Sequence, residues 1–553
     1  MITLLLGALS LLSFITLLFC LSGLLDHQNP SVDERLIGGL TVFLLASNTA
    51  QLLTGLTSVG AKAFIGSAAM IGIRRLSRTS NFTWNRRISL PLFGATCGAS
   101  TVLLLLAQLS SRATLNYDAD LYHFAIVEAL SSERLIIGWA NVHERFAVQS
   151  SVFHVAAFLD NGLWGADGYR LSGSLFTCIS LVCFCSSFRR VQQATSGPGD
   201  LLCIFALPAI WAVSLLDQYH FNGPSLDPPN ALMAIVAATK VADFMLRRDM
   251  RSFEVAALAV VVSYSVRPQG LVLMVVFVAG VLTLCPGRRR EMLLSRARPS
   301  VALLMVIVGR SFLLSGFPFA PLPWSIPRIS WALDEREMAE FAQTVRSWGR
   351  KFGGTDDLGL LNFRWFPDWW ATNSAGLTIF VSLGFLGLLL WMLAPRDVWA
   401  FSRVHLASVV SVGVIPLLAW FLSAPAPRFG WGYLAVGGAL WTLAIDLSDK
   451  NRQRFDQSGA EVVRALSLAV VGLLVLIPLT WGQRGVLFET SPQLPILPQD
   501  ESPALAGIAS ENPIELKVPR YGDQCGWEFW CSPRDPGALN VTKFGPWWVT
   551  RRS

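Results

Sequence analysis

Residues 88–123 read ISLPLFGATCGASTVLLLLAQLSSRATLNYDADLYH and contain both signals that decide the fold. The first part, Ile88 to Leu109, is apolar and long enough to cross a bilayer as a helix, which needs about 20 residues. A polar stretch follows, with Asp118 and Asp120 two residues apart and His123 after them. Ionisable groups at a membrane surface are costly unless they have a role, so this stretch is the first candidate for a functional site.

The whole chain has the composition of an integral membrane protein. Of its 553 residues, 53% are hydrophobic and 15% are charged. Apolar runs of about 20 residues recur, and a backbone in lipid must satisfy its own hydrogen bonds, so these runs predict helices. The net charge of +7 does not indicate nucleic-acid binding, because the arginines cluster in short loops between apolar runs. We therefore predict an all-α integral membrane protein with about 13 transmembrane helices.

The positions of the basic loops predict a topology, because short loops rich in Arg and Lys stay in the cytoplasm. These loops are 74–87, 189–190, 247–251, 288–298, 396–403 and 450–454. The loops expected on the outer face are 26–35, 111–150, 217–229, 265–269, 316–375 and 424–431, with the tail after 482. Residues 1–482 would then form the membrane domain, and residues 483–553 a periplasmic tail or small subdomain.

Four segments need a separate interpretation. Residues 1–25 lack a basic region and a cleavage site, so we expect a retained helix. Residues 59–73 are too short and too rich in Gly and Ala to cross alone, and we expect them to continue the preceding helix. Pro268 predicts that the apolar run 255–285 is two short helices turning at 265–269. Residues 331–350 are amphipathic and predict an interfacial helix.

The chain's notable polar motifs fall on the predicted outer face and combine carboxylates with arginines. That pairing is expected where an acid or base acts beside a phosphate, so we expect the motifs to share a cavity. The candidate residues are Asp118, Asp120, His123, Asn141, His143, Glu144, Arg145, Asp227, Arg267, Arg310 and Arg428.

Structural interpretations of the same residues stay open. The two aspartates of the first loop and Asp227 suit helix N-caps, the last because Pro228 follows it. Arg267 can snorkel to the interface. Arg310 can pair with a local carboxylate, Arg428 can anchor the chain at the interface, and His143 and Glu144 can form a polar pair that orients their loop.

Metal and disulfide sites are weaker expectations. Asp118 and Asp120 with a histidine could hold a divalent cation such as Mg²⁺ or Mn²⁺, although no fixed ligand spacing stands out. Cys525 and Cys531 flank Gly-Trp-Glu-Phe-Trp in the polar tail and could pair if the tail lies in an oxidising compartment.

The order of the motifs resembles the GT-C superfamily of multi-span glycosyltransferases and, more narrowly, a bacterial membrane-protein family of that type. The similarity covers nearly the whole chain after about residue 88. It rests on the motifs at 117–123, 141–146, 224–229, 315–318, 424–429 and 522–525. The resemblance implies that an acidic residue of the first outer loop is the general base, here Asp118 or Asp120. Many members have two adjacent acids, whereas Ala119 separates them here.

The same resemblance implies a polyprenyl-phosphate sugar donor whose phosphate the arginines bind, and a glycan or lipid acceptor on the outer face of a bacterial inner membrane. Two other functions stay open. A polysaccharide polymerase or ligase of the O-antigen type would depend more on the arginines than on the aspartates. A lipid or solute transporter, or flippase, would have charged residues at the bilayer midplane and broken helices in two related halves.

Overall fold

The computed structural model describes most of the chain up to residue 444 and parts of the tail. The described residues are 2–25, 30–79, 90–111, 116–148, 150–193, 195, 197–216, 223–322, 329–351, 359, 361–393, 403–444, 505–508, 514, 516–519, 525–532 and 539–552. The span expected between 454 and 482, the motif at 217–222 and residues 522–524 of the tail motif lie outside them.

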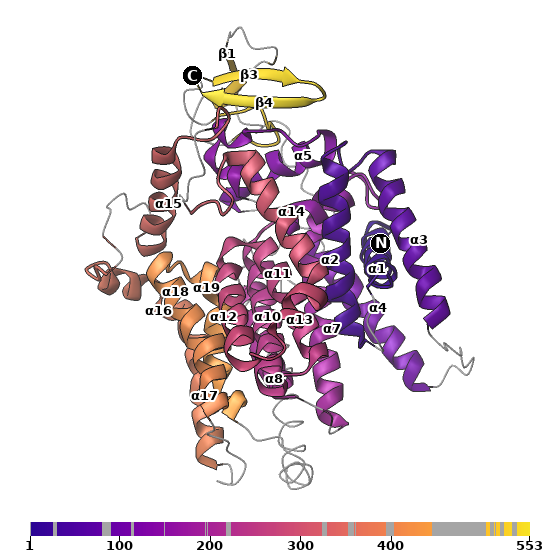
Figure 1. Cartoon of the computed structure of the whole chain (residues 1–553), viewed down its shortest axis with the longest axis vertical. Helices are drawn as coiled ribbons and strands as arrows, with labels where there is room; N and C mark the ends of the chain where they lie inside the picture. Colours follow the sequence, from indigo (N-terminus) through magenta and orange to yellow (C-terminus); the bar gives the residue numbers. More distant parts are fainter. Residues whose placement is uncertain are drawn as a thin grey trace.

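The described chain is mostly helical, as predicted (Figure 1). Five of its helical segments are long and apolar enough to cross a membrane: Ile2–Ser22, Gly168–Gln192, Asp227–Arg247, Arg298–Ser315 and Arg403–Ser423. Shorter apolar helices cover Gly98–Ser110, Gly199–Ser214, Pro268–Leu284 and Gly376–Gly387. The total of about 13 transmembrane helices stays a prediction.

The helices of the first half follow one another closely. They are α1 (Ile2–Ser22), α2 (Val32–Gln51), α3 (Val59–Thr79), α4 (Leu90–Ser110), the π-helical turn η1 (Ala119–His123), α5 (Phe124–Ser132), η2 (Trp139–Asn141), η3 (Glu144–Ala147), α6 (Ser151–Leu159), η4 (Gly168–Leu171), α7 (Ser172–Gln192), α8 (Pro198–Leu216) and α10 (Asp227–Arg247).

The second half continues the bundle. Its helices are α11 (Met250–Val266), η5 (Pro268–Gly270), α12 (Leu271–Leu284), α13 (Arg289–Glu291), η6 (Met292–Arg296), α14 (Arg298–Ser315), α15 (Glu335–Arg350), α16 (Phe366–Leu393), α17 (Arg403–Val409), η8 (Val410–Val414), α18 (Ile415–Ser423), α19 (Pro427–Ala439) and η9 (Leu440–Ala444). The helix pair predicted to turn at 265–269 is confirmed by α11, η5 and α12, and α15 confirms the helix predicted within 331–350.

Helix α10 forms the centre of the bundle and packs against α7, α8, α11 and α19. Its residues are buried along nearly the whole helix. Gly432 of α19 lies against the backbone of α10, and a Cβ there would come within 2.6 Å of the Ala231 carbonyl oxygen. This close approach requires a residue without a side chain. It brings the first turn of α19, which carries Arg428, next to the first turn of α10, which carries Asp227.

The N-terminus of α2 lies at the arginine-rich end of the bundle. Asp33 is fully buried and pairs with Lys240 at 2.7 Å and with Arg190 at 3.3 Å, while Glu34 pairs with Arg251 at 2.7 Å. The described part of loop 26–35 therefore lies beside loops 189–190 and 247–251, whereas the pattern of basic loops placed it on the opposite side of the membrane from them. A rule that counts only basic residues misses acidic residues whose partners are cations of other helices.

The other end of α2 corrects a second expectation. Leu56 N donates to the Leu130 carbonyl at 2.8 Å, so this end lies beside α5. Helix α3 then begins at Val59 as a separate helix and runs back along α1, where Gly72 approaches the Cys20 carbonyl. Residues 59–73 do not continue the preceding helix.

The tail adds β-structure that the all-α prediction lacked. Strand β1 (Leu505–Ile508) pairs antiparallel with β2 (Leu516–Pro519), and β3 (Leu539–Phe544) pairs antiparallel with β4 (Trp547–Arg552). Figure 1 shows β3 and β4 at the end of the molecule where α5 lies. Ile137 N donates to the Trp548 carbonyl at 2.9 Å, so β4 is joined to the loop that follows α5.

Candidate functional site

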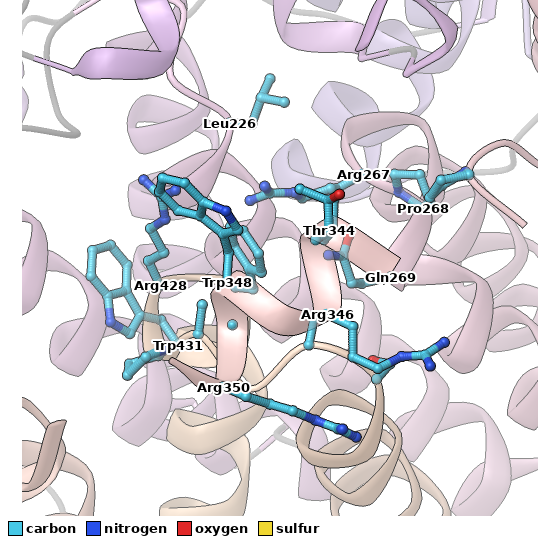
Figure 2. Close-up of a pocket in the computed structure, with 18 of the residues that line it drawn as sticks. Leu226, Arg267, Pro268, Gln269, Thr344, Arg346, Trp348, Arg350, Arg428 and Trp431 are labelled. Atoms are coloured by element: carbon cyan, nitrogen blue, oxygen red, sulfur yellow. The ribbon is translucent and has the colours of Figure 1, made fainter. Parts of the chain in front are cut away.

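A cavity of about 1890 Å³ opens beside η1 at the end of the bundle that carries α5 and the tail strands. Its wall combines the polar loop after α4, the turn between α11 and α12, helices α15 and α16, and the start of α19. Of the predicted site residues, Asp118, Arg145, Arg267 and Arg428 line it. Figure 2 shows two of them, Arg267 and Arg428.

A chain of alternating charges lies at the cavity wall, and of its members only Asp227 does not line the cavity itself. Asp118 Oδ1 lies 3.1 Å from Arg145 Nη1, and Asp118 Oδ2 lies 3.3 Å from Arg428 Nη2. Arg428 Nε lies 3.7 Å from Asp227 Oδ2, and the other oxygen of Asp227 pairs with Arg267. Three guanidinium groups share two carboxylates, so the group keeps a formal charge of +1.

Local sequence explains why each of these charged residues lies at the end of a helix. Arg428 follows Pro427, the first residue of α19, and Asp227 precedes Pro228 at the start of α10, positions where proline favours the beginning of a helix. Arg267 is extended before Pro268, in the turn that separates α11 from η5. Three helix ends thus point their charges at one place.

The ring of Phe429 supports two of the arginines. The guanidinium of Arg267 lies 4.1 Å from the ring centroid and that of Arg428 lies 5.2 Å from it. Arg145 is placed in the same way over Tyr122, at 5.3 Å. Cation–π contacts of this kind fix the cations without using up their hydrogen-bond donors.

The electrostatic surroundings keep Asp118 ionised. Burial alone would raise the pKa of this carboxyl, but the nearby charges of Arg428 and Arg145 hold the pKa below its ordinary value of 3.8. The Asp118 side chain is 14% exposed and its main-chain N–H donates to Asn116 Oδ1 at 3.0 Å. A fixed carboxylate therefore faces the cavity.

Asp120 has different surroundings. It does not line the cavity, and burial raises the pKa of its carboxyl. Its main-chain carbonyl accepts hydrogen bonds from Cys525 N at 3.1 Å and Gly526 N at 2.8 Å. The two acids of the loop are thus distinguished by position, which their spacing in the sequence could not do.

His123 is buried behind the charge chain, with its ring against Tyr122 and Phe153. Within the described chain neither ring nitrogen has a hydrogen-bond partner, and burial lowers the pKa of His123 to about 3. The side chain is therefore neutral at physiological pH.

Asn141, His143 and Glu144 hold the loop that carries Arg145. Asn141 Nδ2 donates to the carbonyls of Gly138 and Trp331, each at 2.9 Å. His143 Nδ1 lies 3.2 Å from Glu144 Oε2 and accepts the Arg145 N–H at 3.4 Å. None of the three forms part of the cavity wall.

Arg310 is not brought to the cavity. It is buried within α14 and donates to the Gln51 side chain at the end of α2. The apolar run 301–314 predicted a helix with Arg310 near its outer end, but it did not predict the direction of the side chain, which points between helices.

Residues of α15 complete the cavity although the sequence did not single them out as a site. Figure 2 shows Arg346, Trp348 and Arg350 on α15, with Arg346 and Arg350 pointing away from Arg267 and Arg428. Arg350 stacks on Trp365 at 5.3 Å and donates to the carbonyls of Gly359 and Leu422. The amphipathic pattern of residues 331–350 predicted the helix, but it did not indicate that the helix would line a cavity.

The described side chains form no group of three or more His, Cys, Asp or Glu residues that could hold a metal ion. Both oxygens of Asp118 are taken by guanidinium groups. The arginine-rich wall is suited instead to an anion.

Fold and cavity together define a largely helical protein that has helices long and apolar enough to span a membrane and an arginine-lined cavity at one end of the bundle. The sequence profile of a family described as "Domain of unknown function (DUF8201)" matches residues 1–435. The chain belongs to this family. No curated protein matches the chain, and no solved structure matches it.

Proposed function

We propose that the protein is a GT-C-type glycosyltransferase that moves a sugar from a polyprenyl-phosphate donor to a glycan or lipid acceptor. The cavity would face the outer side of a bacterial inner membrane. The observation that carries the proposal is the alternating charge chain, in which Asp118 lies between Arg145 and Arg428 on the cavity wall.

The charge chain supplies both groups that such a transfer needs. The acceptor oxygen forms a bond to the anomeric carbon while the bond from that carbon to the donor phosphate oxygen breaks. The acceptor proton passes to Asp118, the general base. Arg145, Arg267 and Arg428 stabilise the negative charge that develops on the departing lipid phosphate.

Donor binding also prepares the base. In the structure both oxygens of Asp118 are paired with arginines, which weakens the carboxylate as a base. An incoming phosphate competes for Arg145 and Arg428, because guanidinium groups bind phosphate in the same bidentate manner as carboxylate. Loss of these contacts raises the pKa of Asp118 once the donor is present. The base is thus activated only when there is a sugar to transfer.

The cavity wall is also suited to an amphiphilic donor. Beyond the arginines it includes Leu271 and Val272 of α12 and Ile379 of α16, which belong to apolar helices. A phosphate at the charge chain would leave its lipid chain beside these side chains, where apolar contact with bilayer-facing helices stabilises it.

The proposal is tested by sugar transfer in membranes that contain the full-length chain and a labelled polyprenyl-phosphate sugar. Wild-type membranes should transfer the label to endogenous acceptor, and Asp118→Asn membranes should lose the transfer. Full transfer by both Asp118→Asn and Asp120→Asn contradicts the assignment. Loss on replacing the arginines but not Asp118 would favour a polymerase or ligase, and movement of intact lipid without transfer would favour a flippase.

A further inference from the structure

The disulfide-closed loop of the tail lies against the turn that carries the two aspartates. Cys525 and Cys531 are joined by a disulfide, and both are buried. The bond closes a short loop that contains Gly526, Trp527 and Trp530. None of these loop residues belongs to the charge chain, so the charge chain does not explain why the loop lies beside η1.

The loop binds η1 through main-chain hydrogen bonds. The N–H groups of Cys525 and Gly526 both donate to the carbonyl of Asp120, at 3.1 and 2.8 Å. Gly526 adopts a φ of +59°, a conformation that favours glycine and directs two successive N–H groups at one oxygen. A wide π-helical turn has a looser hydrogen-bond pattern than an α-helix, so outside donors of this kind help to fix it.

The loop also packs against α5, the helix that follows η1. The Trp527 ring stacks on Phe124, with centroids 4.5 Å apart and planes at 10°, and meets Tyr169 edge-on at 5.0 Å. Phe124 is the first residue of α5 and is fully buried. The main chain after Asp118 is therefore held at Asp120 and at Phe124 by residues more than 400 positions away.

The loop is itself held in place. Trp139 Nε1 donates to the Phe529 carbonyl at 3.2 Å, and Lys517 of β2 pairs with Glu528 at 2.6 Å. Lys517 N also donates to the Trp530 carbonyl at 3.0 Å. These contacts and the disulfide together fix the conformation of the loop. Without the disulfide, we expect the N–H groups of Cys525 and Gly526 to lose their fixed orientation.

We propose that the disulfide-closed loop 525–531 is a positioning element that holds η1 so that Asp118 stays between Arg145 and Arg428. Replacement of the two cysteines then lowers transfer without removing a catalytic residue. The predicted effect of the loop on transfer rests on the proposed function. The predicted effect of the loop on the position of η1 does not depend on that function. Displacement of a catalytic group by about 1 Å can cost on the order of 100-fold in rate.

The test uses the full chain in lipid nanodiscs, with Cys525→Ser/Cys531→Ser and Trp527→Ala as separate variants. Trp527→Phe keeps a stacking ring, and Cys185→Ser replaces an exposed free cysteine as the matched control. Hydrogen exchange of the peptide amides in 118–124 should become on the order of tenfold faster in the first two variants only. Unchanged exchange in both variants overturns the inference, whether or not the protein transfers sugar.

The transfer assay adds the second measurement. In the same two variants kcat should fall about 10- to 100-fold while KM for the lipid donor stays within about twofold, because the arginines that bind the phosphate remain. Unchanged kcat despite faster exchange overturns the positioning role. If exchange is faster in the variants but the wild-type protein transfers no sugar, the inference that the loop holds η1 is supported. The proposed function is then contradicted instead.

Discussion

Asp118 and Arg428 lie 310 residues apart in the sequence, yet the carboxylate Oδ2 and the guanidinium Nη2 are 3.3 Å apart on the wall of one cavity. Arg428 also reaches Asp227, at 3.7 Å. It is therefore the centre of the charge chain, and the pair joins the loop after α4 to the start of α19. The acid–cation pairing that the proposed transfer requires exists before any substrate is bound.

Replacement of the two aspartates should separate them. Asp118→Asn removes the carboxylate that faces the cavity, and we expect transfer to fall about 100- to 10,000-fold, the usual contribution of a general base. Asp120→Asn keeps the main-chain carbonyl that the tail loop binds, and transfer should fall less than about tenfold. The measurement is the initial rate of labelled-sugar transfer at equal protein level. Equal losses in the two variants would contradict the assignment of Asp118.

Replacement of Arg428 should weaken phosphate binding. A charged hydrogen bond contributes about 1.5–3 kcal/mol, so Arg428→Gln should raise the Kd for polyprenyl phosphate about 10- to 100-fold. Arg298→Gln, at an exposed arginine of α14, is the matched control and should leave Kd unchanged. Binding can be followed by native mass spectrometry of the purified protein. Equal affinity of the two variants would show that the phosphate binds elsewhere.

Protonation of His123 should make the fold sensitive to acid. Burial lowers the folded-state pKa to about 3, whereas the unfolded side chain titrates near 6.5. Between these values the unfolded state binds the extra proton, so the stability due to neutral His123 is complete above pH 6.5 and decreases as the pH falls. By pH 5 the loss is about 2 kcal/mol. Thermal unfolding from pH 7.5 to 5 should show a smaller loss for His123→Leu, and an equal loss would refute the prediction.

The corrected position of α2 predicts which sides of a membrane its two ends reach. Val32 is 53% exposed at the arginine-rich end, and Leu53 is 65% exposed at the cavity end. In a background with Cys185→Ser, an impermeant thiol reagent added outside intact spheroplasts should label Leu53→Cys. Val32→Cys should react only after the membrane is opened. Labelling of both from outside would restore the outward position of loop 26–35.

The sequence predicted the parts of the site that depend on local pattern. The apolar run before residue 110 predicted a helix, and the acids after it had to lie at the helix end. Asp227-Pro228-Pro229 marked a further helix start, whereas Pro427-Arg428 was predicted to lie in an outer loop and instead begins α19. Each of these signals lies within a few residues, which is the range over which helix propensity and capping act.

What the sequence could not provide depends on contacts between distant helices. The approach of Gly432 to Ala231 brings Arg428 to Asp227, and no local pattern indicates it. Arg310 and Arg267 both interrupt apolar runs, but one turns to Gln51 and the other to Asp227. The partners of Asp33 lie on two other helices, Arg190 on α7 and Lys240 on α10, so the orientation of α2 could not be read from basic loops alone.

The most direct measurement is a structure of the full-length protein with a polyprenyl-phosphate analogue bound. The analogue's phosphate should lie within hydrogen-bonding distance of Arg428 and of Arg145 or Arg267, with Asp118 released from at least one of its arginines and facing the anomeric position. A phosphate bound away from this charge chain, with Asp118 still paired to both arginines and turned away from the lipid headgroup, would contradict a glycosyltransferase centred on Asp118.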